Sequence, residues 1–112
     1  MSKPAIRPYS HYCSDALALL GQLVREGRLE KNMTTSDLAM RAGISRSLLQ
    51  RIERGDAGCS IGVVFEVAAI CGVALFQQDQ RLMATTLALH REKMSLLPKS
   101  VRKSSERLKD DF

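Results

Sequence analysis

Residues 33–55 read MTTSDLAMRAGISRSLLQRIERG, and this stretch decides the fold. Thr34 is a good N-cap for a first short helix, and Asp37 follows it at the spacing of a capping box. Gly43 is typical of a left-handed helix end, and Ser45 is placed to cap a second helix. The pattern therefore predicts two short helices joined by a tight glycine turn.

Apolar residues at helical spacing predict which sides of these two helices are buried. The inward set comprises Leu38, Ala39, Ala42, Leu49 and Ile52. Ile44 and Leu49 have the spacing of a hydrophobic staple around Ser45, and Gly55 ends the second helix. The polar set left on the outside of the second helix comprises Arg46, Ser47, Gln50, Arg51 and Arg54.

This is the layout of a helix-turn-helix, in which the second helix enters the DNA major groove. Sequence-specific DNA binding is therefore the leading hypothesis. The competing interpretation is an ordinary helical hairpin with a solvated basic face, because motif matches carry false positives. A hairpin of that kind rarely combines the caps, the staple, the small residue at Ala39 and the final glycine in so short a stretch.

Length and composition limit the number of domains, the kind of core and the kind of partner. The chain has 112 residues and a net charge of +5, with 45% hydrophobic but only 4% aromatic residues. This length suits one domain with a tail, and its core must be aliphatic. A basic balance suits a polyanionic partner without proving one. Residues 1–12 lack the apolar centre of a secretion signal, and no apolar run approaches a membrane span.

The three cysteines are Cys13, Cys59 and Cys71, an odd number without a CxxC pair. We therefore expect reduced thiols in a cytoplasmic, nucleoid-associated protein. His11 and Cys13 could share a metal, but no third and fourth ligand follow at normal spacing, so neither a metal nor a cofactor is expected. No phosphate-binding glycine loop, nucleophile elbow or kinase signature is present, and we do not expect an enzyme.

Periodicity predicts three further helices around the motif. The first covers residues 15–30 with Ser14 as its cap, and the fourth covers residues 60–71, from Ser60 to the stop at Gly72. The fifth covers residues 76–95. Two sets repeat every seven residues along it, Leu75, Leu82 and Leu89, and Phe76, Met83 and His90. Such a stripe indicates either a dimer contact or packing within the chain, and the sequence leaves both open.

The expected organisation is a flexible N-terminal arm over residues 1–13, a helical domain over 14–95 and a tail over 96–112. The tail loses the helical pattern at Pro98 and is rich in basic residues and serine. It nevertheless holds Leu96, Leu97, Val101, Leu108 and Phe112. We expect it to become ordered on a protein partner or on the body of a dimer.

Three segments carry a resemblance to a known family: LGQLVREGRLEKNMTTSDLA, GISRSLLQRIERG and SIGVVFEVAAICGV. They are similar to the Xre family of lambdoid-repressor-like regulators over about residues 18–73. The resemblance implies an all-α, five-helix, lambda-repressor-like DNA-binding domain with flexible termini.

The resemblance also implies roles for individual residues. Arg46, Ser47 and Arg51 fall on base-reading positions. Gln50 is left on the same outward side of the helix, and we expect it to read bases with them. Contacts to DNA phosphates are implied for Thr35, Ser45 and Arg54, with Thr35 standing where the family usually has glutamine. Arg28 and Glu53 match the family's structural ion pair between the first and third helices.

Within that family, the C-terminal part resembles HipB-type antitoxins. The resembling segments are LLPKSVRK over residues 96–103 and DDF over residues 110–112. This implies a homodimeric autorepressor that binds double-stranded operator DNA and a HipA-like kinase toxin complex. Two alternatives stay open: a stand-alone or phage-type repressor, and a protein-interaction module that inhibits an enzyme without binding DNA.

Overall fold

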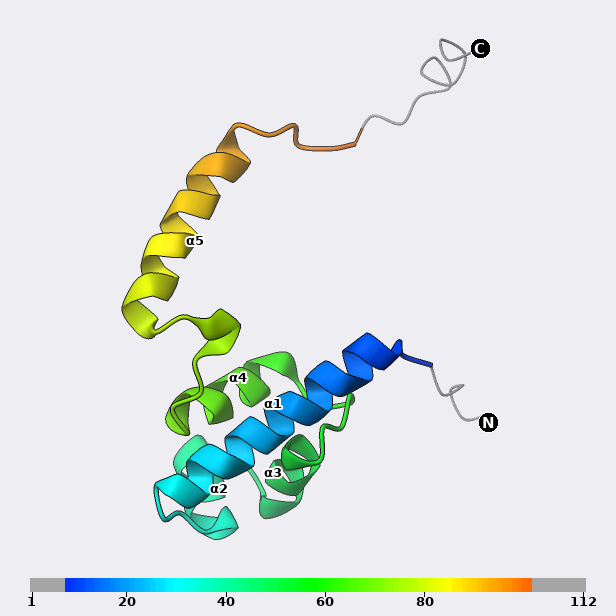
Figure 1. Ribbon diagram of the computed structural model, residues 1–112, viewed down its shortest axis with the longest axis vertical. Coiled ribbons are helices and arrows are strands. Elements are labelled where there is room, and N and C mark those ends of the chain that lie inside the picture. Colours follow the sequence, from blue (N-terminus) through cyan, green and yellow to red (C-terminus); the bar gives the residue numbers. More distant parts are fainter. Residues whose placement is uncertain (1–7, 102–112) are drawn as a thin grey trace. The chain divides into compact units, whose positions relative to one another are not determined.

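The computed structural model describes residues 8–101, and within them the chain is all-helical (Figure 1). Five α-helices and one short 3₁₀ turn follow in order: α1 (His11–Glu30), α2 (Thr35–Ala42), α3 (Arg46–Glu53), α4 (Ile61–Ile70), η1 (Leu75–Gln77) and α5 (Gln80–Ser95). The all-α, five-helix prediction is confirmed. The chain forms two compact units, the first ending at Gln77 and the second beginning at Gln78.

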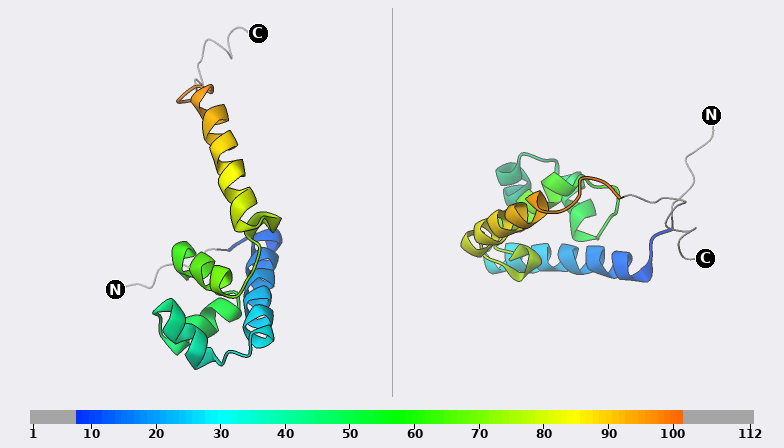
Figure 2. Two further views of the ribbon diagram at one scale, coloured as in Figure 1. Left: turned by 90° about the vertical axis from the view of Figure 1, so that its left-hand side faces the viewer. Right: turned by 90° about the horizontal axis from the view of Figure 1, so that it is seen from above.

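The first unit is a four-helix domain. α1 packs against α3 and α4, and α2 packs against the same two helices. Figure 2 shows α1 on one side of the other three helices. The four largest fully buried side chains come one from each helix: Val24, Leu38, Leu49 and Val67. The core is aliphatic, as the composition predicts, and it fixes α3 from one side only.

The close approach of α1 to α3 depends on Gly21, which is buried. A Cβ atom at this position would lie 2.6 Å from the carbonyl oxygen of Glu53 and 2.7 Å from that of Ile52. Both neighbours are backbone atoms, so neither can rotate away. Gly62 on α4 is the opposite case, since a Cβ atom there would meet nothing within 4 Å.

We therefore expect Gly21→Ala to lower the free energy of unfolding by about 1–3 kcal/mol, because the extra methyl group overpacks the α1–α3 contact. Gly62→Ala is the matched control. It should leave stability unchanged or raise it by at most about 1 kcal/mol, since alanine is the better helix former. Urea unfolding of the two variants measures the difference. Equal stabilities would mean that the α1–α3 contact is looser than the structure indicates.

The predicted start of the first helix is wrong. α1 begins at His11 with Ser10 as its N-cap, and the Ser10 hydroxyl accepts a hydrogen bond from the Cys13 backbone N–H at 3.1 Å. Ser14, the predicted cap, lies inside the helix. The two serines are equally suitable caps, and no glycine or proline separates them, so the helix continues to the earlier one.

The predicted fifth helix is correct at its end and wrong at its start. Asp79 caps α5, and its carboxylate accepts a hydrogen bond from the Leu82 N–H at 2.8 Å. Phe76 and Gln77 have positive φ values of 55° and 59°, which no α-helix can contain. Leu75 and Phe76 therefore lie outside α5, and only the later members of the seven-residue repeats share that helix. The predicted 60–71 helix is confirmed as α4 with Ser60 as N-cap and Cys71 as C-cap.

Candidate nucleic-acid interface

The helix-turn-helix begins with the capping box that the sequence predicts. The Thr34 hydroxyl accepts the Asp37 N–H at 3.0 Å, and the Asp37 carboxylate accepts the Thr34 N–H at 2.9 Å. The backbone hydrogen bond from Thr34 lowers the pKa of Asp37, so this carboxylate is charged at neutral pH. The start of α2 is thus defined by two residues that lie three apart in the sequence.

The turn between α2 and α3 is equally local. Gly43 has a φ of 70°, a left-handed conformation that glycine adopts without a Cβ penalty. The Ile44 N–H then donates to the carbonyl oxygen of Ala39 at 2.9 Å. Ser45 caps α3 by accepting the Leu48 N–H at 3.0 Å. The turn therefore fixes the direction in which α3 leaves α2.

α3 has one buried and one exposed side, as predicted. Leu49 and Ile52 are buried in the core, whereas Arg46, Ser47 and Gln50 are exposed. Arg46 is the first residue of α3. In a helix-turn-helix, the residues near the N-terminus of the second helix come closest to the base edges. Three of the four proposed base-reading residues thus lie together on an exposed side of α3.

The three proposed phosphate contacts lie at helix ends. Thr35 is the first residue of α2 and is half-buried, and Arg54 is the exposed C-cap of α3. The Ser45 hydroxyl uses its oxygen as the acceptor for the α3 cap. Its proton is therefore free to be donated to a phosphate oxygen. Unpaired N–H groups at the start of α3 add donors of the same kind.

Among the described residues, Arg51 forms an ion pair, whereas Arg46 and the C-cap residue Arg54 do not. Nε of Arg51 lies 2.9 Å from Oδ2 of Asp56, and the two side chains are 40% and 37% exposed. This hydrogen bond raises the pKa of Arg51 and lowers that of Asp56. The other oxygen of Asp56 accepts the Gly58 N–H at 2.7 Å. Sequence reasoning did not include Asp56 in the site, although Asp56 follows the stop glycine directly.

Arg28 and Glu53 are brought together in a buried fork that joins α1 to α3. Nε of Arg28 lies 2.8 Å from Oε2 of Glu53, and its Nη2 lies 3.2 Å from Oε1. The third donor, Nη1, reaches the carbonyl oxygen of Met33 at 3.0 Å. The two side chains are only 8% and 9% exposed. The hydrogen bonds that Arg28 donates to the Glu53 carboxylate raise the pKa of Arg28.

This pair positions the candidate interface and lies outside it. Glu53 is the last residue of α3, and Met33 lies just before α2. Arg28 therefore ties both helices of the motif to α1 through one guanidinium group. A bidentate pair of this kind fixes an angle as well as a distance.

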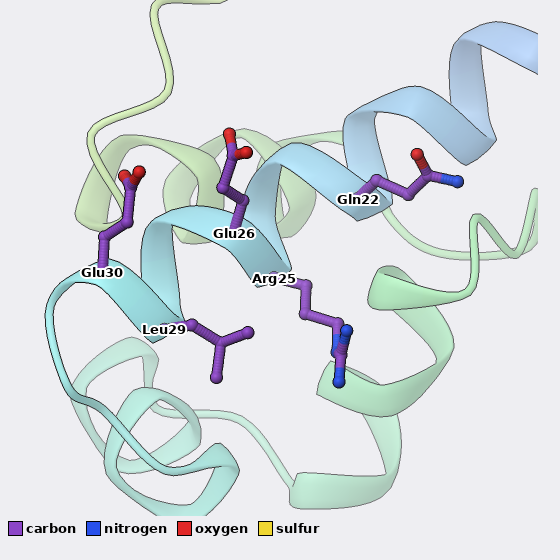
Figure 3. Close-up of a pocket in the computed structure, with 5 residues that line it drawn as sticks. All are labelled: Gln22, Arg25, Glu26, Leu29 and Glu30. Atoms are coloured by element: carbon purple, nitrogen blue, oxygen red, sulfur yellow. The ribbon is translucent and has the colours of Figure 1, made fainter.

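A shallow hollow of about 560 Å³ lies along α1, lined by Gln22, Arg25, Glu26, Leu29 and Glu30 (Figure 3). Glu26 and Glu30 point to one side of α1, and Arg25 and Leu29 point to the other. All five residues come from one helix, so the hollow is not a cleft between elements. Its two carboxylates give it a charge unsuited to a phosphate backbone.

Comparison with known proteins identifies the motif independently. A family described as a helix-turn-helix domain matches residues 19–83, which is more than half of the chain. Neither the curated proteins nor the solved structures include a match. Among the helices of the described residues, none combines the length and the apolar character that a membrane span requires.

Proposed function

The chain belongs to the helix-turn-helix domain family, and on this premise we propose that it is a transcriptional regulator that reads DNA with α3. The observation that carries this proposal is that α3 has an apolar, buried side and a polar, exposed side. Leu49 and Ile52 anchor the helix in the core, while Arg46, Ser47 and Gln50 project from its opposite face. Arginine and glutamine are side chains that can make two hydrogen bonds to one base.

The phosphate contacts set the register of α3 in the groove. Ser45 and Arg54 bracket α3, and Thr35 begins α2, so both helices of the motif present a polar group at an end. Contacts of this kind orient a protein on the duplex without carrying sequence information. Arg54 supplies the charge, and Ser45 and Thr35 supply hydroxyl donors.

We propose that the regulator acts as a homodimer through α5. This helix has 16 residues and buries none of them. Leu82, Leu87, Leu89 and Met94 are each about half exposed or more. An isolated helix of this length is marginally stable in water, so its apolar side chains need a cover. A second copy of the same helix is the cover that suits an operator with two half-sites.

The dimer proposal predicts that Leu89→Asp will shift the protein to a monomer at micromolar concentration, because it buries a charge at the centre of the contact. Ala88→Asp is the matched control, since it places the same carboxylate one residue away, on another side of α5. It should leave the dimer intact. Sedimentation equilibrium measures both variants, and a dimer in both cases would exclude α5 as the interface.

For the specific biological role of this regulator, we propose that the protein is the antitoxin and autorepressor of an operon that also encodes a HipA-like kinase. The support is the resemblance of residues 96–103 and 110–112. Within the described part, Leu96, Leu97 and Val101 are exposed apolar side chains of the proposed tail, over 96–112. Residues 102–112 lie outside the described residues.

Deletion of residues 96–112 tests this role. Operator affinity should stay within about tenfold, which is 1.4 kcal/mol, while capture of a co-expressed neighbouring kinase in a pull-down should be lost. The opposite result, unchanged capture with loss of DNA binding, would make the tail a DNA-binding arm. If no kinase gene lies next to the gene of this protein, the protein would instead be a stand-alone repressor.

Fluorescence anisotropy tests the DNA-binding function itself. The probes are the duplex upstream of the gene and a shuffled duplex of the same composition. We expect tighter binding to the upstream duplex by a factor of roughly 10³ or more at physiological salt. Equal affinities for both duplexes would leave only the electrostatic attraction of a basic protein, and no binding to either would favour the enzyme-inhibiting module.

A further inference from the structure

We propose that Asp56 is a positioning residue that holds Arg51 so that its two terminal nitrogens face a guanine end-on. This inference rests on the proposed DNA-binding function and adds a specificity determinant to it. Asp56 touches no base itself. It acts through the guanidinium group of Arg51.

The backbone around Asp56 is fixed before its side chain is considered. Gly55 has a φ of 79° and reverses the chain after α3. The Asp56 N–H then donates to the carbonyl oxygen of Arg51 at 3.0 Å. Its carboxylate is held on one side by the Gly58 N–H at 2.7 Å, which leaves Oδ2 for Arg51. Asp56 is therefore a rigid acceptor for the guanidinium group.

The contact with Asp56 determines which edge of the Arg51 guanidinium group remains available to DNA. A guanidinium group can make two parallel hydrogen bonds either through Nε and one Nη, or through both Nη atoms. Asp56 occupies Nε at 2.9 Å, which removes the first arrangement. A Cβ atom on Gly58 would lie 3.1 Å from Nη2, so the loop after Asp56 passes close to the guanidinium group. Both Nη atoms remain for the O6 and N7 acceptors of guanine.

The proposed role of Asp56 in base reading can be distinguished from a role in stability. The pair is well exposed to solvent, and exposed ion pairs add little to stability. Asp56 also places a negative charge next to the proposed phosphate contact at Arg54. It should therefore weaken attraction to DNA in general while improving the reading of one base. These two effects have opposite signs and can be measured separately.

The experiment uses the full chain and a duplex selected by it from a random pool. Each guanine of that duplex is replaced in turn by 7-deazaguanine, which lacks the N7 acceptor. The guanine read by Arg51 is the one whose replacement weakens binding of the wild type but not of Arg51→Ala. We expect a penalty of roughly fivefold or more for the wild type at this guanine.

Asp56→Ala should reduce the 7-deazaguanine penalty to about twofold or less, while binding to random DNA stays equal or tightens by up to about fivefold. Glu66→Gln removes the same charge from an exposed position on α4 and should keep the full penalty. Thermal unfolding checks that Asp56→Ala folds, and Asp56→Asn, which conserves the shape, replaces it if it does not.

The inference is overturned if Asp56→Ala keeps the full penalty, or if Arg51→Ala abolishes the penalty at no guanine. Either result leaves the proposed function standing, because a preferred sequence has then been found. If the wild type selects no sequence at all, the proposed function fails, and this inference fails with it.

Discussion

Replacing Glu53 by alanine is expected to lower the free energy of unfolding by about 3–5 kcal/mol. Glu53 lies on the protein side of α3 and pairs with Arg28 through two hydrogen bonds in a site that is more than nine-tenths buried. Removing the carboxylate leaves the guanidinium charge of Arg28 in the core with only the carbonyl oxygen of Met33 as a partner. Such a loss is a large part of the stability of a small domain.

Urea unfolding measures this effect, with Glu66→Ala as the matched control because Glu66 is exposed on α4. The control should change stability by no more than about 0.5 kcal/mol. A double-mutant cycle with Arg28→Met then isolates the pair, and the double variant should be more stable than Glu53→Ala alone. Additive effects of the two substitutions would show that the side chains do not interact in solution.

Arg46→Ala is expected to cost about 1–3 kcal/mol of binding free energy on the preferred operator and much less on random DNA. Arg46 is the first residue of α3, is exposed, and has no partner among the hydrogen bonds and ion pairs of the described residues. Its guanidinium group is therefore free to reach a base edge. Discrimination should be lost at one base pair and kept elsewhere.

Arg54→Ala is the matched comparison, since it removes the same side chain from the other end of α3. We expect it to weaken binding to all sequences and to flatten the dependence of log K on log salt by about one unit. Titrations at several salt concentrations, on operator and random duplexes, distinguish the two variants. Equal losses on both duplexes for Arg46→Ala would assign Arg46 to the phosphates instead.

The helix-turn-helix could be predicted from the sequence because its determinants are local. The Thr34 capping box, the left-handed Gly43 and the Ser45 cap each act on residues within about one turn. The residues that form these caps and the turn are of types strongly preferred at helix ends, so they can be recognised in the sequence. The inward and outward sides of α3 follow from helical periodicity in the same way.

The predictions of two helix starts were wrong because two local signals compete there. The Arg51–Asp56 pair was missed because the tertiary structure determines it. Ser10 and Ser14 are both good caps, and the apolar pattern does not distinguish them. The seven-residue repeat continues through Leu75 and Phe76 even though Asp79 begins a new helix. The Arg51–Asp56 pair depends on the path of the chain after Gly55, which no periodicity encodes.

Selection from a random pool of duplex DNA, sequenced after several rounds of binding, tests the central claim most directly. A homodimer that reads bases with α3 should enrich an inverted repeat whose half-site centres lie about 10–10.5 base pairs apart, or a multiple of that distance. Recovered sequences that remain as diverse as the starting pool, at a salt concentration where the protein still binds DNA, would contradict sequence-specific recognition by α3.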